Sequence, residues 1–68
     1  MLDSNLTMAQ AQNIAITQGK KIRHRYFLDT EFIYCKGTVW YNEEGYVMPN
    51  EWWQKMDRNW DTGWSVVD

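Results

Sequence analysis

The fold is decided within residues 18–27, which read QGKKIRHRYF. Before this stretch, apolar residues recur at helical spacing. After Gly19, apolar and charged residues alternate with a period of two, which is typical of a strand. Gly19 lies at the change of period, where a residue in the left-handed conformation commonly ends a helix. The stretch therefore predicts a helix that leads directly into a β-strand.

The predicted helix begins at Met8 and ends at Gln18. Thr7 before it is a favourable N-cap, and Gln10, three residues after Thr7, completes a capping box. The residues expected to face the core are Ala11, Ile14 and Ala15, which lie on one side of this helix. The whole chain, 1–68, is expected to form a single domain. Its residues 1–6 are expected to form a short, partly ordered lead.

The strand that follows is predicted to have a basic face. On a strand, Ile22, His24 and Tyr26 would point to one side. The side chains expected on the other side are Lys21, Arg23, Arg25 and Phe27. Four of the seven cations in the chain lie within residues 20–25, while the rest of the chain holds all nine acids. Such a strand is typical of a phosphate site, since arginine and lysine bind phosphate, and equally typical of a solvated surface.

The remaining residues predict a small antiparallel sheet and a second helix. Strands are expected at 31–36, 38–41 and 46–48, with a hairpin turn at 42–45 in which Gly45 has a positive φ. Phe32 and Tyr34 share one face of the first of these strands. Asn50 is expected to cap a short helix over 51–57, followed by a turn at 59–63 and a last strand at 64–67. This pattern predicts an α+β fold, with the first helix packed on the sheet and the second near the C-terminus.

The aromatic residues exceed what so small an interior easily holds. The chain has 68 residues, of which five are Trp, four Tyr and two Phe. Most of the Trp side chains are expected to fill the core. Trp52 and Trp53 would point about 100° apart on a helix, so one of them is expected to face a partner or a ligand. A domain of this size buries only about 60% of its unfolded surface, which favours a homo-oligomer, a dimer or tetramer.

Composition excludes several classes of protein. The sequence has no apolar run long enough to span a membrane and no signal-peptide pattern, so a cytoplasmic protein is expected. One cysteine and one histidine, Cys35 and His24, do not suffice for a disulfide framework, a metal site or a catalytic constellation. We therefore expect neither an enzyme nor a cofactor. With a net charge of −2, polymeric nucleic acid is not an expected partner.

Both ends of the chain resemble a known family. A Thr-capped, Ala-rich helix leads into Gly19-Lys20-Lys21-Ile22-Arg23, and the chain closes with Trp64-Ser65-Val66-Val67. Over residues 7–27 and 60–67 the chain resembles the phage anti-Thoeris nucleotide-sponge family, the second type of Thoeris anti-defence protein. Phe27 stands where the family has Trp, and Gly63 where it has Asp. The resemblance implies a phage protein that acts inside the infected bacterium. It would sequester a cyclic or ADP-ribose-type nucleotide signal without cleaving it, and it would form a homo-oligomer.

Two functions follow as expectations. In the first, a small binding protein captures an anionic nucleotide. The ligand-binding residues are then Lys21, Arg23 and Arg25 for phosphate, with Tyr26 and Phe27 stacking on the base. In the second, the chain inhibits a host defence protein or nuclease through an acidic surface. The partner-binding residues are then Glu43, Glu44, Glu51, Trp52 and Asp57.

Overall fold

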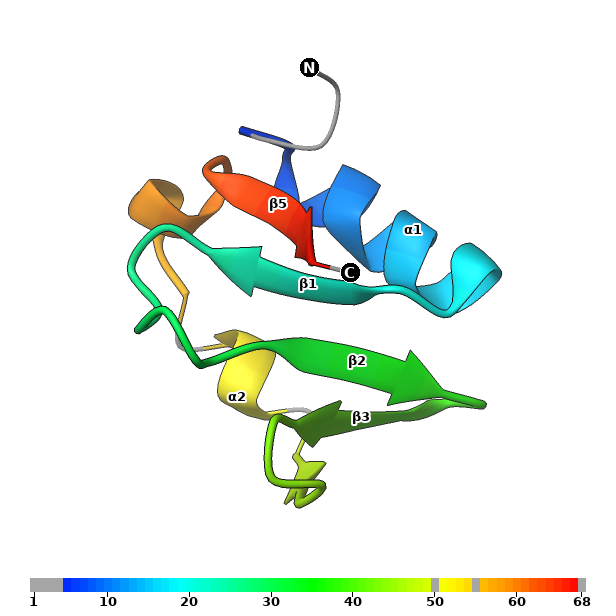
Figure 1. Cartoon of the computed structure of the whole chain (residues 1–68). Helices are drawn as coiled ribbons and strands as arrows, with labels where there is room; N and C mark the ends of the chain where they lie inside the picture. The colour runs from blue at the N-terminus through cyan, green and yellow to red at the C-terminus, as the bar shows by residue number, and fades with distance from the viewer. Residues whose placement is uncertain (1–4, 50, 55, 68) are drawn as a thin grey trace.

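The computed structural model describes residues 5–49, 51–54 and 56–67, and its chain forms one antiparallel sheet with helices on one side (Figure 1). The elements are α1 (Met8–Gln18), β1 (Lys21–His24), β2 (Ile33–Lys36), β3 (Val39–Asn42), β4 (Val47–Met48), α2 (Glu51–Gln54), the 3-10 helix η1 (Arg58–Trp60) and β5 (Trp64–Val67). The five strands are ordered β4-β3-β2-β1-β5. The predicted α+β class is confirmed.

Helix α1 begins and ends as its sequence predicts. The Thr7 hydroxyl accepts the backbone N–H of Gln10 at 3.1 Å, and the Gln10 side chain accepts the backbone N–H of Thr7 at 3.0 Å. Both bonds satisfy donors that a helix start otherwise leaves unpaired. Gly19 ends the helix in the left-handed region, with φ of 66°. These caps place Lys21 at the first position of β1.

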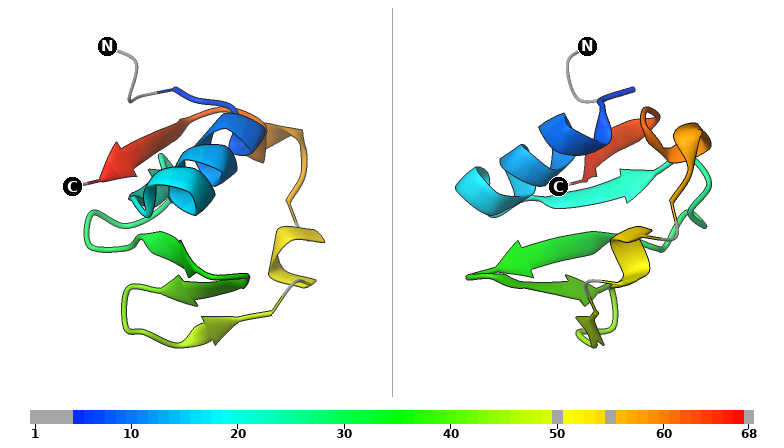
Figure 2. Two further views of the ribbon diagram at one scale, coloured as in Figure 1. Left: turned by 90° about the vertical axis from the view of Figure 1, so that its right-hand side faces the viewer. Right: turned by 180° about the vertical axis from the view of Figure 1, so that it is seen from behind.

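The core lies between the sheet and the two helices. The fully buried apolar residues are Ala11, Ala15, Ile22, Ile33 and Trp64. Helix α1 packs on β1, β2 and β5, and α2 lies on the same side of the sheet, as the reversed view in Figure 2 shows. Trp53 of α2 contacts Trp40 and Trp64, with ring centroids 5.2 and 5.8 Å apart. Trp52 and Trp53 both pack against this core, so the angle between them on the helix does not keep either away from it.

The opposite side of the sheet is not covered by either helix in the part of the chain that the structure describes. Ile22 pairs with Ile33 and points toward α1. Alternation along the strands therefore turns their neighbours to the other side. We call this side the open face, and its residues are Lys21, Arg23, Phe32, Tyr34, Lys36, Val39, Tyr41, Val47, Ser65 and Val67.

Strand β1 is shorter than the alternating pattern predicts. It ends at His24, and the Phe27 N–H then donates to the His24 carbonyl at 2.9 Å, which turns the chain. The prediction that Arg25, Tyr26 and Phe27 continue the strand is therefore wrong. The turn extends to Glu31, whose N–H donates to the Leu28 carbonyl, so β2 starts at Ile33 rather than at residue 31.

Several further boundaries differ from prediction by one to three residues, including the start of β4 at Val47 instead of residue 46, and one cap is outside the described residues. Helix α2 ends at Gln54 instead of Asp57. The Asp57 carboxylate instead accepts the Asn59 N–H at 2.9 Å and starts η1 within the predicted turn. Strand β3 begins at Val39, one residue late, and Asn50, the expected cap of α2, lies outside the described residues.

The chain start is tied to the sheet at Leu6. Its N–H donates to the Trp64 carbonyl at 2.7 Å, and the Trp64 N–H donates back at 3.1 Å. Within the lead predicted over residues 1–6, Leu6 is thus paired with the sheet, and residues 1–4 lie outside the described residues. Strand β5 matches its prediction at both ends.

Candidate functional site

Three aromatic rings form a row on the open face. Tyr34 of β2 and Tyr41 of β3 are register partners. Their rings stack with centroids 5.5 Å apart and planes inclined by 17°. The ring of Phe32 continues the row, 6.3 Å from Tyr34. Each of these side chains is half-buried by its neighbours, so the row presents a firm aromatic surface rather than separate mobile rings.

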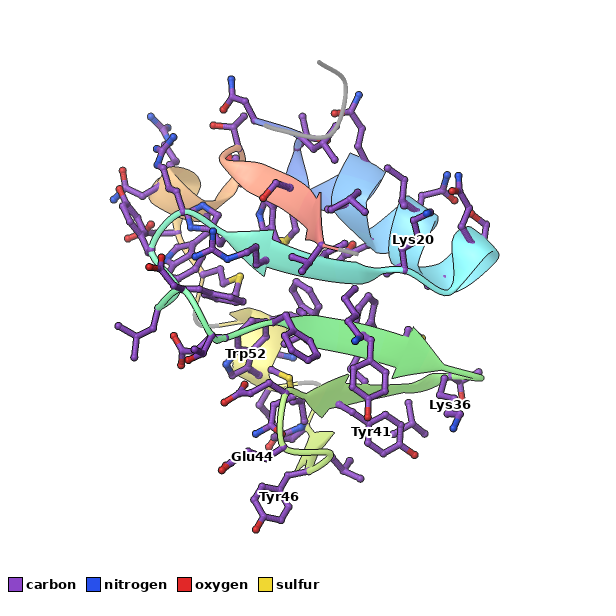
Figure 3. All side chains as sticks on the ribbon, in the orientation of Figure 1. Lys20, Lys36, Tyr41, Glu44, Tyr46 and Trp52 are labelled. Atoms are coloured by element: carbon purple, nitrogen blue, oxygen red, sulfur yellow. The ribbon has the colours of Figure 1, made fainter. Side chains whose placement is uncertain are left out.

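Cations lie beside this row. The Nζ of Lys21 lies over the ring of Phe32, 4.8 Å from its centroid, in a cation–π contact. Lys36 is exposed at the end of β2. Figure 3 shows Lys20 and Lys36 toward one end of the sheet and Trp52 and Glu44 toward the other. The open face therefore combines aromatic surface with positive charge, from Lys36 at one end of the sheet and from Lys21 over the ring of Phe32.

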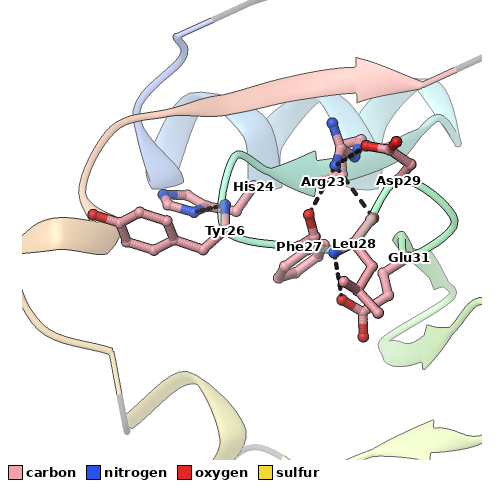
Figure 4. Close-up of polar contacts among 7 residues, drawn as sticks. All are labelled: Arg23, His24, Tyr26, Phe27, Leu28, Asp29 and Glu31. Atoms are coloured by element: carbon pink, nitrogen blue, oxygen red, sulfur yellow. Dashed lines mark hydrogen bonds and ion pairs between the residues drawn. The ribbon is translucent and has the colours of Figure 1, made fainter.

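The side chain of Arg23 forms its contacts with the loop after β1. Its Nη2 donates to the carbonyl oxygens of Phe27 and Leu28 at 3.1 and 3.2 Å, and lies 4.0 Å from the Asp29 carboxylate. Figure 4 shows the guanidinium reaching these three groups. Its Nε is buried and has no hydrogen-bond partner among the described residues. The side chain that the sequence assigns to phosphate thus closes the β1–β2 loop.

The other predicted ligand residues do not share a face with Lys21. Arg25 is exposed, with its guanidinium carbon 5.4 Å from the centroid of the Tyr26 ring. Tyr26 packs edge-on against Trp60 at 5.3 Å. Phe27 is half-buried against the core, with Trp64 5.8 Å away. The structure therefore brings Arg25 and Tyr26 together beyond the end of β1 and turns Phe27 inward.

His24 is a structural histidine with both ring nitrogens occupied. It is fully buried. Nε2 lies 2.7 Å from the Thr62 carbonyl oxygen and Nδ1 accepts the Tyr26 N–H at 3.1 Å, which together define the neutral tautomer with hydrogen on Nε2. Burial lowers the pKa of His24 despite the Thr62 hydrogen bond, and the positive charge of Arg25 lowers it further. A buried, neutral, fully bonded imidazole is poorly placed for proton transfer to a ligand.

A cavity of about 320 Å³ opens at the end of the sheet opposite Lys36. It lies between the β1–β2 loop, the β3–β4 hairpin and the start of α2. Its lining residues are Phe27, Glu31, Phe32, Ile33, Asn42, Glu43, Val47, Met48, Pro49 and Trp52. We call it the acidic aromatic cavity, because both charged residues among these are glutamates.

The acidic residues predicted for a protein partner are spread over several elements. Glu43 and Trp52 both line the cavity. Glu44 is exposed in the hairpin turn, and Glu51 is exposed in the first turn of α2. Asp57 caps η1. Only Glu43 and Trp52 of this set are therefore brought together at a hollow.

The stacked pair on the open face was missed as a site by sequence reasoning. The alternation places Phe32 and Tyr34 on one side, but pairing of Tyr34 with Tyr41 depends on the register across the Gly37 turn. A turn of two residues at Gly37 and Thr38 would have given that register. That neither helix covers the rings depends on tertiary packing and leaves no local signal.

Among the described residues, no helix is long and apolar enough to cross a membrane. In the same part of the chain, no three His, Cys, Asp or Glu side chains are grouped so that they could hold a metal ion.

Comparisons with protein-family models, with curated proteins and with solved structures find no match for this chain. The resemblance to the anti-Thoeris family therefore stays a prediction from short sequence motifs, and the arguments about function depend on the geometry of the two sites.

Proposed function

We propose that this protein binds an anionic nucleotide of the cyclic or ADP-ribose type and sequesters it without cleaving it. The observation that carries the proposal is the Tyr34–Tyr41 stack on a sheet face that neither helix covers, with Lys21 over the ring of Phe32 next to Tyr34. Aromatic rings provide stacking surfaces for bases, and nearby cations attract the phosphates. Capture of such a signal would make the protein an inhibitor of nucleotide-dependent immunity, as expected for a phage protein.

The residues of the proposed nucleotide site differ from those that the sequence suggests, and they lie farther along the sheet. Lys21 remains a phosphate ligand and is joined by Lys36, while Tyr34 and Tyr41 take the stacking role. Arg23 supports the loop beside them through its carbonyl contacts. Phe27 is left out because its ring packs against Trp64.

The surroundings of His24 support binding over catalysis. The chain has one histidine, and it is buried with its two nitrogens bonded to backbone groups. A general base must reach the proton that it removes, and this imidazole lies beneath the surface, on the opposite side of the sheet from the Tyr34–Tyr41 stack.

Charge reversal tests the proposed site. Lys36→Glu should weaken binding of a cyclic ADP-ribose-type nucleotide about tenfold or more, measured by isothermal titration calorimetry at low salt. Arg58→Glu is the matched control, since Arg58 is an exposed cation in η1, and it should leave the affinity unchanged. Equal losses in the two variants would show that net charge alone attracts the ligand.

The second candidate is inhibition of a host protein, and the position of Glu43 and Trp52 at one cavity favours it. A pull-down from host lysate with the double variant Glu43→Lys, Glu44→Lys should then lose the partner that the wild-type protein retains. Lys36→Glu should keep that partner. The two functions thus respond to charge reversal at opposite ends of the sheet.

A further inference from the structure

The acidic aromatic cavity offers a second binding site with chemistry opposite to that of the open face. Three aromatic residues line it, Phe27, Phe32 and Trp52, together with Glu31 and Glu43. Its volume of about 320 Å³ is at the small end of the range for ligand pockets. It therefore suits a compact group rather than a whole nucleotide.

Glu31 is held in place by the loop that carries it. One of its carboxylate oxygens, Oε1, accepts the Leu28 N–H at 2.7 Å, and its own N–H donates to the Leu28 carbonyl at 2.9 Å. Figure 4 shows the second carboxylate oxygen pointing away from this loop. Glu31 therefore presents a fixed acceptor whose orientation costs no further ordering when a ligand binds.

The backbone of the hairpin that carries Glu43 is closed by hydrogen bonds to Asn42. The side-chain oxygen of Asn42 accepts the N–H groups of Glu44 and Tyr46 at 2.9 and 3.0 Å, and the Gly45 N–H donates to the Asn42 carbonyl. The turn is thus closed by several bonds to one residue. Glu43 belongs to this turn and is one of the residues that line the cavity.

The rings add attraction for a cation. The face of an aromatic ring carries negative potential, and Trp is the most effective of the three aromatic types. Phe32 already attracts one cation in this protein, since the Lys21 ammonium lies 4.8 Å from its centroid. Trp52 is held against Phe27 and Trp53, with ring centroids 6.2 and 4.9 Å away, so its orientation is also set before any ligand binds.

We propose that the acidic aromatic cavity binds a guanidinium group, either of a small guanidino compound or of an arginine side chain on a partner. A guanidinium is planar, stacks on aromatic rings and donates hydrogen bonds within its plane to carboxylates. A quaternary ammonium has no donors for Glu31 and Glu43. A primary ammonium is more strongly hydrated and lacks the planar face.

This site is independent of the proposed nucleotide site. Its ligand has the opposite charge and lies toward the other end of the sheet, although Phe32 borders both. The Lys21→Gln variant distinguishes the two, because it removes a cation from the vicinity of Phe32. It should weaken nucleotide binding and leave guanidinium binding equal or tighter.

The probe is Nα-acetyl-arginine amide, titrated into the ¹⁵N-labelled full chain and followed by NMR. Shifts should be concentrated at the amides of Glu31, Phe32 and Glu43 and at the Trp52 indole N–H. The matched control ligand is Nα-acetyl-citrulline amide, which has nearly the same shape without the charge. Binding of the citrulline compound with the same affinity would overturn the proposal, as would shifts spread over the surface.

Glu43→Gln should raise the Kd of the arginine probe about fivefold, since it removes one of two carboxylates in a partly exposed site. Glu44→Gln is its matched control, because Glu44 is the next residue of the same turn and does not line the cavity. Unchanged affinity in Glu43→Gln, or equal losses in both variants, would contradict the proposal. Tetramethylammonium chloride tests selectivity: binding as tight as that of the arginine probe would overturn the preference for guanidinium.

A second ligand tests whether the guanidinium comes from a small compound or from an arginine of a protein partner. A blocked Gly-Gly-Arg-Gly-Gly peptide should bind about tenfold more tightly than the blocked amino acid if the cavity serves a protein partner, because the backbone then adds contacts. Equal affinities identify a small guanidino compound as the natural ligand. Either result requires that the arginine probe binds at the cavity, and failure of that binding contradicts both.

Discussion

The rings of Tyr34 and Tyr41 stack across β2 and β3, with planes only 17° apart. Both side chains come from strands whose other side faces the core, so their position is set by the sheet itself. This rigidity matters for binding, since the rings lose little freedom when a base stacks on them. Substitution of either tyrosine is therefore the most sensitive test of nucleotide binding on the open face.

Removing one ring of the stack should weaken nucleotide binding. Stacking on an aromatic side chain contributes about 1–3 kcal/mol per base, so Tyr41→Ala should raise the Kd about tenfold or more in calorimetry. Tyr46→Ala is the matched control: Tyr46 is 67% exposed in the hairpin turn, apart from the stack (Figure 3). Similar losses in both variants would count against stacking on Tyr41.

A variant of Arg25 distinguishes two locations for the nucleotide site, one along an extended basic strand and one on the open face. Phosphate binding along a fully extended basic strand would require Arg25, and Arg25→Glu would then abolish binding. The strand ends at His24, and Arg25 lies with Tyr26 beyond it. On the open-face proposal, calorimetry of Arg25→Glu should show a loss of about twofold or less, from long-range charge alone. Complete loss with the fold intact would return the site to Arg25 and Tyr26.

Stability should depend on pH through His24. Because the pKa of His24 is lowered from its ordinary value of 6.5 by burial, the unfolded chain takes up a proton below pH 6.5 that the folded chain does not. The free energy of unfolding should therefore fall as the pH falls below about 6.5, and this contribution should be constant above it. Denaturant titrations across this range measure the slope, and His24→Gln should reduce it.

The imidazole itself can be observed directly in the folded protein. Its carbon-bound ring protons should titrate in NMR spectra with a midpoint below 6.5, since burial lowers the pKa of His24 and protonation of Nδ1 would remove the acceptor of the Tyr26 N–H. A midpoint at or above 6.5 would contradict a buried neutral histidine.

Gly63 should tolerate no side chain. Its φ is 93°, and an added Cβ would lie 3.0 Å from the His24 Nε2 and 3.1 Å from the Arg25 Nη1. Gly63→Ala should lower the free energy of unfolding by about 1–3 kcal/mol for the backbone alone, with a further loss from the contact with the immobile His24 ring. Gly45→Ala is the control, because its φ is also positive but nothing lies within 4 Å of its Cβ. Equal losses in chemical denaturation would mean that the contact with His24 costs nothing.

The protein should assemble into a dimer or tetramer. The chain exposes apolar side chains that include Val47 and Ile16, at 63% and 56%, and its core contains few large side chains. Light scattering at micromolar concentration should give a mass of two or four times 8.2 kDa. A mass of one chain would contradict this expectation.

Local signals in the sequence were sufficient for the first helix and the last strand. Thr7, Gln10 and Gly19 specify the ends of α1 through their own hydrogen bonds and conformations, so no distant contact was needed. The end of β1 differs because it depends on the ring of His24 and on its distant partner, the Thr62 carbonyl. Alternation alone therefore extended the strand too far.

The sites were predicted less well than the fold for the same reason. The sequence groups the basic residues on one strand, but the role of Arg23 depends on carbonyls of a loop that only the folded chain brings near. Glu31 was not singled out, because a lone glutamate at a strand start gives no signal. It borders the cavity only because the β3–β4 hairpin and α2 fold against the loop that carries it.

Calorimetric titration of the purified protein with a panel of cyclic and ADP-ribose-type nucleotides tests the central claim most directly, followed by heat release of the bound ligand and chromatography. The account predicts saturable binding of at least one nucleotide, recovery of that nucleotide intact, and loss of binding in Tyr41→Ala. Absence of binding across the panel would contradict the nucleotide proposal, and recovery of an altered nucleotide would contradict sequestration without cleavage.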